Sequence, residues 1–566
     1  MVFGLNGLTI VHIVQAMNKQ PIPGDTFDAS AWPLRQLTLP RGLAQQALAR
    51  PDKVFLTELA TGRTFTYGSL DAWTTRLAQG LHAIGVARAG HVGVLMENSA
   101  EHLALFFALG KVGAVSVPIN TAARGELLHY YVSHAECSSA IVDAALLPRL
   151  AEVLPQLPLL KRVLVVGQLE EAIPLPAGLQ VFALDALAGA GGTADPLPCI
   201  DCHELLLLAF TSGTTGPSKA SMLSHAAALT YGTGAAQAQR YRASDVFYVC
   251  LPLFHNNALL AAVISALVCG GSVVLSPRFS VSRFWGEIRQ TRATVTNLLG
   301  AMTSFLWSAA PSPADADHQL RLVSMAPVPK HAREFEQRFG LSVMSNYGLS
   351  DFGMATSFTD RDPKEKLGSI GRPRSGMQVR IADDDDFEVP DGQPGEILLR
   401  AEEPWRAATG YFRMPEATLA AHRNQWFHTG DRGMRDADGY FWFVDRKKDC
   451  IRRRGENISA FEVEQILMRH PAVAHAAVVP VTTATNDEEV AAVIVRHEGV
   501  PVQPAELVEH CRLNMAYFMV PRYLQFRDAL PTTASRKVEK FRLKEELQRD
   551  IAQAWDREAA GIAVTR

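Results

Sequence analysis

The sequence lacks a strong excess of charge of either sign. Its 566 residues include 55 Lys and Arg against 58 Asp and Glu, which leaves a formal net charge of -3. Proteins that bind nucleic acid usually carry a pronounced basic excess, so this balance argues against that class of function. We therefore expect no nucleic-acid partner.

Long apolar runs are also missing. The longest apolar helical candidate, Ala258 to Cys269, falls short of the ~20 residues that a membrane-spanning helix needs. The stretch Met1 to Ile13 is apolar, but it has neither the basic n-region nor the small-residue cleavage site of a signal peptide. We expect a cytoplasmic protein without an integral membrane span, and Met17 is an alternative start.

Cysteine is scarce, with seven residues scattered along the chain. Such a distribution argues against a disulfide framework. One cluster, Cys199-Ile-Asp-Cys202-His203, fits the CxxCH pattern of covalent haem attachment, but no export signal and no obvious second axial ligand accompany it. We interpret this cluster as a solvent-side linker before the next strand.

Strand and helix patterns alternate through the N-terminal half of the chain. Apolar runs predict strands at residues 63–67, 91–96, 115–119, 205–210, 272–275 and 294–299. Amphipathic or apolar stretches predict helices from Ser69 onward and at 100–112, 258–268 and 281–290. Such alternation indicates mostly parallel sheets covered on both faces, so the fold class is α/β with two βαβ-type sheets.

The pattern changes near Gly376. Strands predicted at 378–381, 395–400 and 440–444 are separated by turn residues and indicate a β-rich subdomain. The run Asp383 to Asp386 lies between two of them and lacks calcium-loop spacing, so we interpret it as a solvated hairpin turn.

The last part of the chain has the pattern of a separate α+β module. Ser459-Ala-Phe-Glu462 is a capping box that opens a helix, which ends before Pro471. Strands at 474–479, 490–495 and 523–526, a helix at 506–513 and a terminal helix from Lys537 follow. We expect an N-terminal domain over residues 1–447, with its β-rich subdomain at about 376–447, and a small mobile C-terminal domain over 448–566.

A loop rich in glycine and hydroxyl groups follows the apolar strand at 205–210. It reads Thr211-Ser212-Gly213-Thr214-Thr215-Gly216-Pro217-Ser218-Lys219. Glycine lets the backbone approach a ligand closely and turn several N–H groups toward it, while the lysine adds a positive charge. The loop therefore suits a polyphosphate, although no Gly-Lys-Ser/Thr step makes it a Walker A loop.

Four further motifs follow this loop in a fixed order. They are Asn346-Tyr-Gly-Leu-Ser-Asp351, Trp426-Phe-His-Thr-Gly-Asp431, Asp445-Arg-Lys-Lys-Asp449 with Gly455-Glu-Asn457, and Leu530-Pro-Thr-Thr-Ala-Ser-Arg-Lys537. With them the chain resembles, over essentially its whole length, the adenylate-forming superfamily of acyl-CoA synthetases, adenylation domains and luciferases. Leu251-Pro-Leu-Phe-His-Asn-Asn257 and Tyr517-Phe-Met-Val-Pro-Arg522 carry a narrower resemblance to carnitine/crotonobetaine-CoA ligase-like enzymes.

The resemblance implies a two-step reaction that uses ATP, Mg²⁺ and coenzyme A. A carboxylic acid attacks the α-phosphorus of ATP to give an acyl-adenylate and pyrophosphate, and the thiol of CoA then displaces AMP. Because two anions must meet in the first step, catalysis needs positive charge and fixed geometry more than a general base.

Each role falls on a matching position of this sequence. Phosphate-binding positions are Thr211, Ser212, Gly213, Thr214, Thr215, Gly216 and Lys219, and the adenosine positions are Ala326, Pro327, Asn346, Tyr347 and Asp431. Ser350 occupies the hydroxyl position beside the α-phosphate and Asp351 the magnesium-associated position. Weaker assignments place His255 and Gly348 in the acyl pocket, and His255 is nearly as well explained as a structural histidine.

The catalytic positions lie mostly in the C-terminal third. The resemblance implies that Lys537 contacts the carboxylate and α-phosphate in the first step and that Arg446 steadies the ribose and phosphate. Lys448 takes the hinge position, while Arg452 and Gly455 lie on the face used in the second step. Glycine at 455 suits a narrow pantetheine tunnel.

Three departures from the family pattern stand out. Gly216-Pro-Ser-Lys-Ala220 replaces the usual Gly-x-Pro-Lys-Gly, Ser350-Asp351 replaces Thr-Glu, and Arg536-Lys537 replaces Gly-Lys. None of them removes a needed chemical group. Two other functions stay open: loading of a carrier-protein thiol, and a catalytically silent nucleotide sensor. The acid substrate is not identified, and a homodimer is left open.

Overall fold

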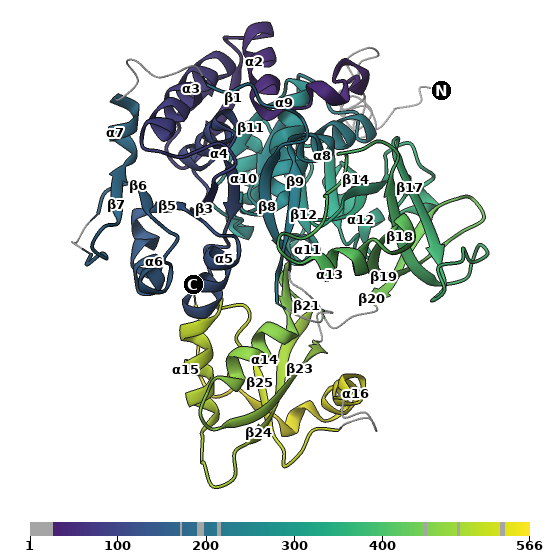
Figure 1. The fold of residues 1–566 in the computed structure, drawn as a ribbon. Helices are drawn as coiled ribbons and strands as arrows, with labels where there is room; N and C mark the ends of the chain where they lie inside the picture. Colours follow the sequence, from purple (N-terminus) through teal and green to yellow (C-terminus); the bar gives the residue numbers. More distant parts are fainter. Residues whose placement is uncertain are drawn as a thin grey trace, which may run out of the picture.

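The computed structural model describes residues 27–169, 173–189, 197–211, 217–446, 450–483, 487–531 and 538–565. Figure 1 shows a large body that contains the N-terminal sheets, with the C-terminal part of the chain as a smaller body beside it. The α/β class and this division into a large and a small part confirm the sequence-based prediction of the fold.

The first large sheet has seven strands, whose inner members are almost wholly buried. Their order is β7 (Gln180–Ala183), β6 (Arg162–Val166), β5 (Ser139–Asp143), β3 (His91–Leu95), β4 (Val115–Pro118), β8 (Leu205–Thr211) and β9 (Lys219–Ser224). All pairs are parallel except β8 with β9. Continuous apolar strands of this kind are typical of parallel sheets covered on both faces.

The second large sheet has nine strands. Their order is β16 (Arg372–Pro373), β15 (Gly353–Phe358), β14 (Ser342–Leu349), β13 (Leu322–Ala326), β12 (Val295–Leu299), β10 (Val246–Val249), β11 (Ser272–Leu275), β1 (Val54–Glu58) and β2 (Thr64–Thr66). The central pairs from β1 through β14 are parallel, and antiparallel strands lie at both edges. Both sheets have the βαβ character that the sequence predicts.

Helices connect and cover these sheets. They are α2 (Leu39–Ala49), α3 (Tyr67–Ala83), α4 (Ala100–Val112), α5 (Gly125–His134), α6 (Leu147–Val153), α7 (Leu184–Gly189), α8 (His225–Ala238), α9 (Ser265–Cys269), α10 (Val281–Thr291), α11 (Gly300–Ser308) and α12 (Ala332–Phe339). Almost every residue of α4 and of the first three turns of α8 is buried, which places both helices inside the large body. The main core joins these helices to strands of both large sheets.

Two local predictions need correction. The helix predicted from Ser69 begins two residues earlier, because the Thr66 side chain caps it reciprocally with Ser69 and Tyr67 packs into the core. The helix predicted at 258–268 begins as a π-helix, η5 (Asn257–Ile264), before α9 continues it. Short π-helical stretches frequently occur at functional sites.

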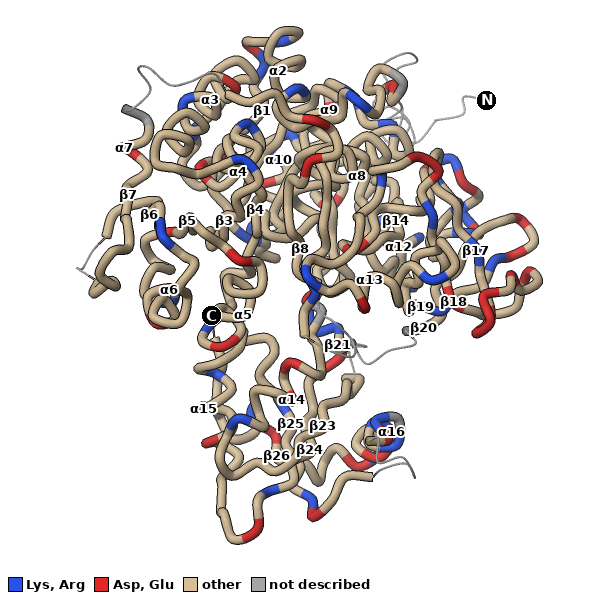
Figure 2. Tube along the Cα trace, in the orientation of Figure 1, with Lys and Arg blue, Asp and Glu red and all other residues tan. Residues whose placement is uncertain are grey.

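The β-rich part forms a four-stranded antiparallel sheet. Its order is β17 (Met377–Ala382), β18 (Gly395–Ala401), β19 (Phe427–Arg435) and β20 (Phe441–Arg446), with α13 (Pro415–Ala421) before β19. The run 383–386 is a turn between β17 and β18, in which Asp383 Oδ1 accepts the N–H groups of Asp385 and Phe387 at 3.0 and 2.9 Å. Figure 2 shows acidic residues gathered there, while basic and acidic residues intersperse elsewhere.

The C-terminal part contains a hairpin, a sheet and three helices. The hairpin is β21 (Cys450–Arg453) with β22 (Glu456–Ser459), and the sheet is β23 (Val473–Thr482), β24 (Glu488–Arg496), β25 (Tyr523–Phe526) and β26 (Trp555–Asp556). The helices are α14 (Ala460–Met468), α15 (Pro504–Asn514) and α16 (Lys540–Asp550). One buried core includes residues of this part and of the seven-stranded sheet, so the two bodies pack directly against each other.

The capping box predicted at the start of α14 is only half formed. Ser459 Oγ accepts the Glu462 N–H at 3.3 Å, as in a capping box. The Glu462 carboxylate, however, accepts a hydrogen bond from Ser218 in the large body and not from the Ser459 backbone. A tertiary contact has replaced the local one.

No helix in the described ranges combines the length and the apolar character needed to cross a membrane. The cysteine cluster lies in the irregular segment directly before β8, as predicted, but of its two cysteines only Cys199 is exposed, whereas Cys202 is buried in the main core. Among the described residues, no group of His, Cys, Asp and Glu could hold a metal ion as a cluster.

Candidate active site

The two ends of the glycine-hydroxyl loop face each other at the edge of the seven-stranded sheet. Thr211, the last residue of β8, pairs with Lys219, the first residue of β9. Residues Ser212, Gly213, Thr214, Thr215 and Gly216 lie outside the described part of the chain. The sheet therefore positions the loop termini, as the strand-loop pattern predicts.

A tyrosine connects the loop lysine to the predicted magnesium position. Lys219 Nζ lies 4.6 Å from the centroid of the Tyr411 ring, and Tyr411 Oη donates a hydrogen bond to Asp351 Oδ2 at 2.6 Å. Burial and the neighbouring Asp351 carboxylate raise the pKa of Tyr411, which keeps its hydroxyl protonated as a donor. The structure thus brings Lys219 and Asp351 to one place.

Sequence analysis missed Tyr411. Its segment lies against β9, where the Met222 N–H donates to the Gly410 carbonyl and Ser221 pairs with Tyr411. No local pattern could have revealed this residue, because its neighbours β9 and Asp351 come from distant parts of the sequence.

The predicted adenosine residues lie on two neighbouring strands of the nine-stranded sheet, β13 and β14, and on β19 of the four-stranded sheet. Ala326 ends β13, and Asn346 on β14 donates from Nδ2 to Ser324 Oγ at 3.0 Å. Tyr347 is buried, and its Oη donates to Asp431 Oδ2 on β19 at 2.8 Å. Ala326, Asn346 and Tyr347 lie toward the carboxyl ends of the parallel strands β13 and β14, which is where an α/β sheet binds ligands.

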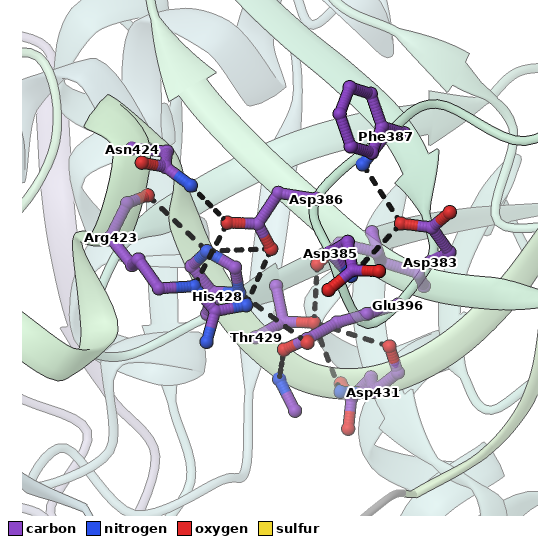
Figure 3. A network of polar contacts seen from close by, with 12 residues as sticks. Asp383, Asp385, Asp386, Phe387, Glu396, Arg423, Asn424, His428, Thr429 and Asp431 are labelled. Atoms are coloured by element: carbon purple, nitrogen blue, oxygen red, sulfur yellow. Dashed lines mark hydrogen bonds and ion pairs between the residues drawn. The ribbon is translucent and has the colours of Figure 1, made fainter.

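A polar network holds Asp431 in place, and Figure 3 shows it from close by. Thr429 Oγ1 accepts the Asp431 N–H at 3.0 Å, and Glu396 Oε1 accepts the Gly430 N–H at 2.9 Å. His428 Nδ1 lies 3.4 Å from Glu396 Oε2 and closes the network toward the turn after β17. Only 5% of Asp431 is exposed, so its carboxylate has a fixed orientation.

Gly348 has a structural reason to be glycine. A Cβ at this position would lie 2.3 Å from the Gly353 carbonyl oxygen and 2.6 Å from Met354 Cα. The close pairing of β14 with β15 therefore excludes any side chain here. The role of Gly348 in an acyl pocket stays a prediction. Ser350, the predicted hydroxyl beside the α-phosphate, lies half-buried in the turn after β14.

The hairpin of the C-terminal part reaches this site. Arg452 donates from Nη2 to the Ala326 carbonyl at 3.1 Å, and its own N–H donates to Glu488 Oε2 at 2.8 Å. Gly455, at the hairpin turn, has φ of +90° and lies against Leu299 at the end of β12. The residues that the resemblance assigns to the second step thus lie beside the predicted adenosine residues.

Substitution of Gly455 by alanine should selectively impair this docking. A Cβ would lie 2.5 Å from Leu299 Cδ1, and φ of +90° strains any L side chain. We expect thioester formation from a preformed acyl-adenylate to fall about tenfold or more, with ATP–pyrophosphate exchange retained. Gly439→Ala is the matched control, because Gly439 has φ of +80° but no neighbour within 4 Å. Equal effects of the two variants would contradict this prediction.

His255 and Glu456 form a pair between the two bodies. His255 Nε2 lies 3.2 Å from a Glu456 carboxylate oxygen. Burial lowers the pKa of His255, but the charge of Glu456 and the hydrogen bond to it outweigh burial, so the net pKa lies above the usual value. The histidine contacts the hairpin in this orientation, and its predicted place in the acyl pocket stays a prediction.

This pair predicts a pH dependence of the second step. A raised histidine pKa means that the contact is strongest below the ordinary pKa of histidine and is lost as pH rises through the raised value. We expect the ratio of wild-type to Glu456→Gln rates of thioester formation to fall as pH rises above the ordinary histidine pKa of about 6.5. Because both enzymes use the same CoA thiol, the ratio removes the effect of thiol titration on the rate. A ratio that stays constant with pH would show that the His255–Glu456 pair does not contribute to the second step.

Two more predicted residues lie outside the described ranges, namely Lys448 at the predicted hinge position and Lys537 at the predicted catalytic position. Arg446 is described through its backbone, which ends β20 and pairs directly with Asp431 in the antiparallel register. Its assignment to the ribose side stays a prediction, and the pairing places it on the neighbouring strand.

Comparison with known proteins identifies the class. Residues 43–412 match the family model of AMP-binding enzymes, and residues 462–537 match that of the AMP-binding enzyme C-terminal domain. The chain therefore belongs to the AMP-binding enzyme family, which confirms the resemblance seen in the motifs.

Individual relatives narrow the comparison. The crotonobetaine/carnitine–CoA ligase of Salmonella paratyphi A is 32% identical over 489 residues, which cover 85% of this chain and 93% of the relative. The o-succinylbenzoate CoA synthetase MenE of Bacillus subtilis, bound to a product analogue, matches with a TM-score of 0.78 at 25% identity over 89% of this chain and 98% of MenE. The amide bond synthetase McbA of Marinactinospora thermotolerans matches with 0.76 at 26% identity over 90% and 99%.

Proposed function

We propose that the protein is an AMP-forming acyl-CoA synthetase that activates a carboxylic acid with ATP and transfers the acyl group to CoA. One observation carries this proposal: residues assigned to both half-reactions converge on one site. Lys219, Asp351 and Asp431 come from the large body, and Arg452 and Gly455 come from the C-terminal hairpin. Named CoA ligases among the relatives support the same reaction.

The adenosine half of the site suits the recognition of a ribose. Asp431 receives the Tyr347 hydroxyl on one carboxylate oxygen, and a carboxylate has lone pairs on both oxygens. In the proposed complex the Asp431 carboxylate accepts hydrogen bonds from the ribose hydroxyls, and the Tyr347 ring stacks on adenine. The buried pair also excludes water, which strengthens each hydrogen bond to the nucleotide.

The phosphate half of the site suits an anion and a hard cation. Lys219 supplies positive charge, and Asp351 supplies the oxygen donors that Mg²⁺ prefers. Mg²⁺ bound there would neutralise phosphate charge during attack by a carboxylate. Tyr411 holds the Asp351 carboxylate through one oxygen, so the other oxygen stays available.

The described orientation presents the second-step residues. Arg452 reaches the Ala326 carbonyl, which lies at the adenosine residues, and the Gly455 turn approaches β12 without a side chain. This arrangement favours the thiol transfer step, in which CoA must pass between the two bodies. We infer that the position of Lys537 at the site belongs to the first step and requires a different orientation of the C-terminal part.

The proposal is tested by a screen of product release over short, medium, aromatic, sterol-derived and betaine-type acids. We expect AMP and pyrophosphate with a suitable acid, and an acyl-CoA when CoA is present. Release of ADP would overturn the proposal. The betaine-type acids test the narrower similarity to crotonobetaine/carnitine–CoA ligases.

The same screen separates the alternatives. Replacement of CoA by a phosphopantetheinyl carrier protein tests carrier loading, and an added amine tests the reaction named for McbA. A nucleotide sensor would show no acid-dependent pyrophosphate exchange with any acid.

A further inference from the structure

A buried hydrogen bond joins the two bodies at the end of the glycine-hydroxyl loop. Glu462 on α14 accepts the Ser218 N–H on Oε1 at 2.8 Å. Both residues are buried, with 8% of Glu462 and 1% of Ser218 exposed. On the other side of the same residue, Tyr130 Oη on α5 donates to the Ser218 carbonyl at 2.6 Å. Ser218 is thereby held by both its backbone groups.

This bond depends on a departure from the family pattern. Ser218 stands where the Gly-x-Pro-Lys-Gly pattern has proline, directly before the lysine. Proline has no backbone N–H, so a chain with the usual residue could not donate to Glu462. The same contact explains why Glu462 does not complete the capping box of α14.

We infer that Ser218 and Glu462 form an interdomain latch that holds the C-terminal part in the orientation that presents Arg452, Gly455 and Glu456 to the site. Glu462 is thus a positioning residue for the second step, and this inference rests on the proposed function. The latch contacts no reacting atom and acts through the hairpin, which directly precedes α14.

Burial makes the latch a strong contact. Burial raises the pKa of Glu462, while hydrogen bonds from the Ser218 hydroxyl and N–H oppose that rise. A buried carboxyl group without a partner is costly, so the group gains stability from the Ser218 N–H in this orientation. A nearby contact between the bodies, the ion pair of Arg469 with Glu126, is about half exposed on the arginine side and contributes little.

The decisive experiment compares the two half-reactions in matched variants. Glu462→Met removes the acceptor, and the exchange Pro217→Ser with Ser218→Pro restores the family order and removes the donor. We expect each to lower single-turnover thioester formation from preformed acyl-adenylate about tenfold. In Glu462→Met, which leaves the phosphate loop unchanged, acid-dependent ATP–pyrophosphate exchange should stay within about twofold. Glu462→Gln keeps an acceptor oxygen and should retain most of the rate.

Two further variants sharpen the test. The combination of Glu462→Met with the 217/218 exchange should be no slower than either alone, because both remove the same contact between residues 218 and 462. Arg469→Gln, at the same interface, should stay within about twofold of wild type. Additive losses, equal losses in both half-reactions, or unchanged thioester formation in Glu462→Met would each overturn the latch.

A second measurement does not depend on activity. Cysteines at positions 126 and 469, in a background with the exposed Cys199 replaced by serine, can be joined by a bifunctional maleimide when the two bodies are docked. We expect Glu462→Met to reduce the yield of this cross-link several-fold, and an unchanged yield would contradict the latch. If wild type shows no acid-dependent exchange, the proposed function is wrong. The cross-link yield still tests the latch in that case, because it does not depend on activity.

Discussion

Lys537→Ala is expected to lower acid-dependent ATP–pyrophosphate exchange by ~10²–10³-fold, the largest single effect that we predict. The first half-reaction brings a carboxylate against a polyphosphate, so the transition state needs a positive charge at the attacking oxygen and the α-phosphate. Lys219 lies beside Tyr411, which donates a hydrogen bond to Asp351. We therefore expect that Lys219 does not replace the charge of Lys537 in this transition state.

The same variant should leave the second half-reaction nearly intact. In the mechanism proposed above, thioester formation from preformed acyl-adenylate uses the orientation in which Arg452 contacts the Ala326 carbonyl. Lys544→Ala is the control, because Lys544 is an exposed lysine of α16. Equal, background-level exchange in wild type and Lys537→Ala across all acids would instead favour a nucleotide sensor.

Asp431→Ala is expected to raise the KM for ATP about 100-fold. Two hydrogen bonds from ribose hydroxyls to a charged, buried carboxylate contribute together ~3 kcal/mol, which corresponds to about that factor. The substitution also leaves the buried Tyr347 hydroxyl without its Asp431 acceptor, and we expect a lower thermal stability as well.

A second tyrosine–aspartate pair serves as the control for Asp431. Tyr440 Oη donates to Asp362 Oδ1 at 2.7 Å, away from the predicted adenosine residues. Asp362→Ala should lower stability in a similar way but leave the KM for ATP within about twofold. A KM that changes equally in both variants would show a general structural effect and would remove Asp431 from the ribose site.

Most of the sheet architecture follows from local sequence. The apolar runs at 91–96, 115–119 and 272–275 predict β3, β4 and β11 nearly to the residue, because a strand buried on both faces needs an unbroken apolar segment. The family motifs likewise predict the adenosine residues, since each motif is a short contiguous segment. These features depend only on neighbours in the chain.

The contacts between distant segments could not be predicted in this way. Tyr411 joins Lys219 to Asp351, and His255 meets Glu456 across the two bodies. Glu462 shows the difference most clearly, because its local pattern predicts a capping box while the folded chain directs its carboxylate to Ser218. The Glu462 carboxylate could accept either a local hydrogen bond within the capping box or one from Ser218 in the large body. In the folded chain it is buried beside Ser218 and accepts the second of these bonds.

The sequence by itself determined the α/β class, the order of the motifs and the family, because periodicity and short motifs are properties of contiguous residues. The tertiary structure alone decided which carboxylates lie beside which cations and which face of the C-terminal part meets the site. The physical reason is that these contacts depend on how the two bodies pack against each other. Their energies come from buried polar groups whose partners lie far away in the sequence.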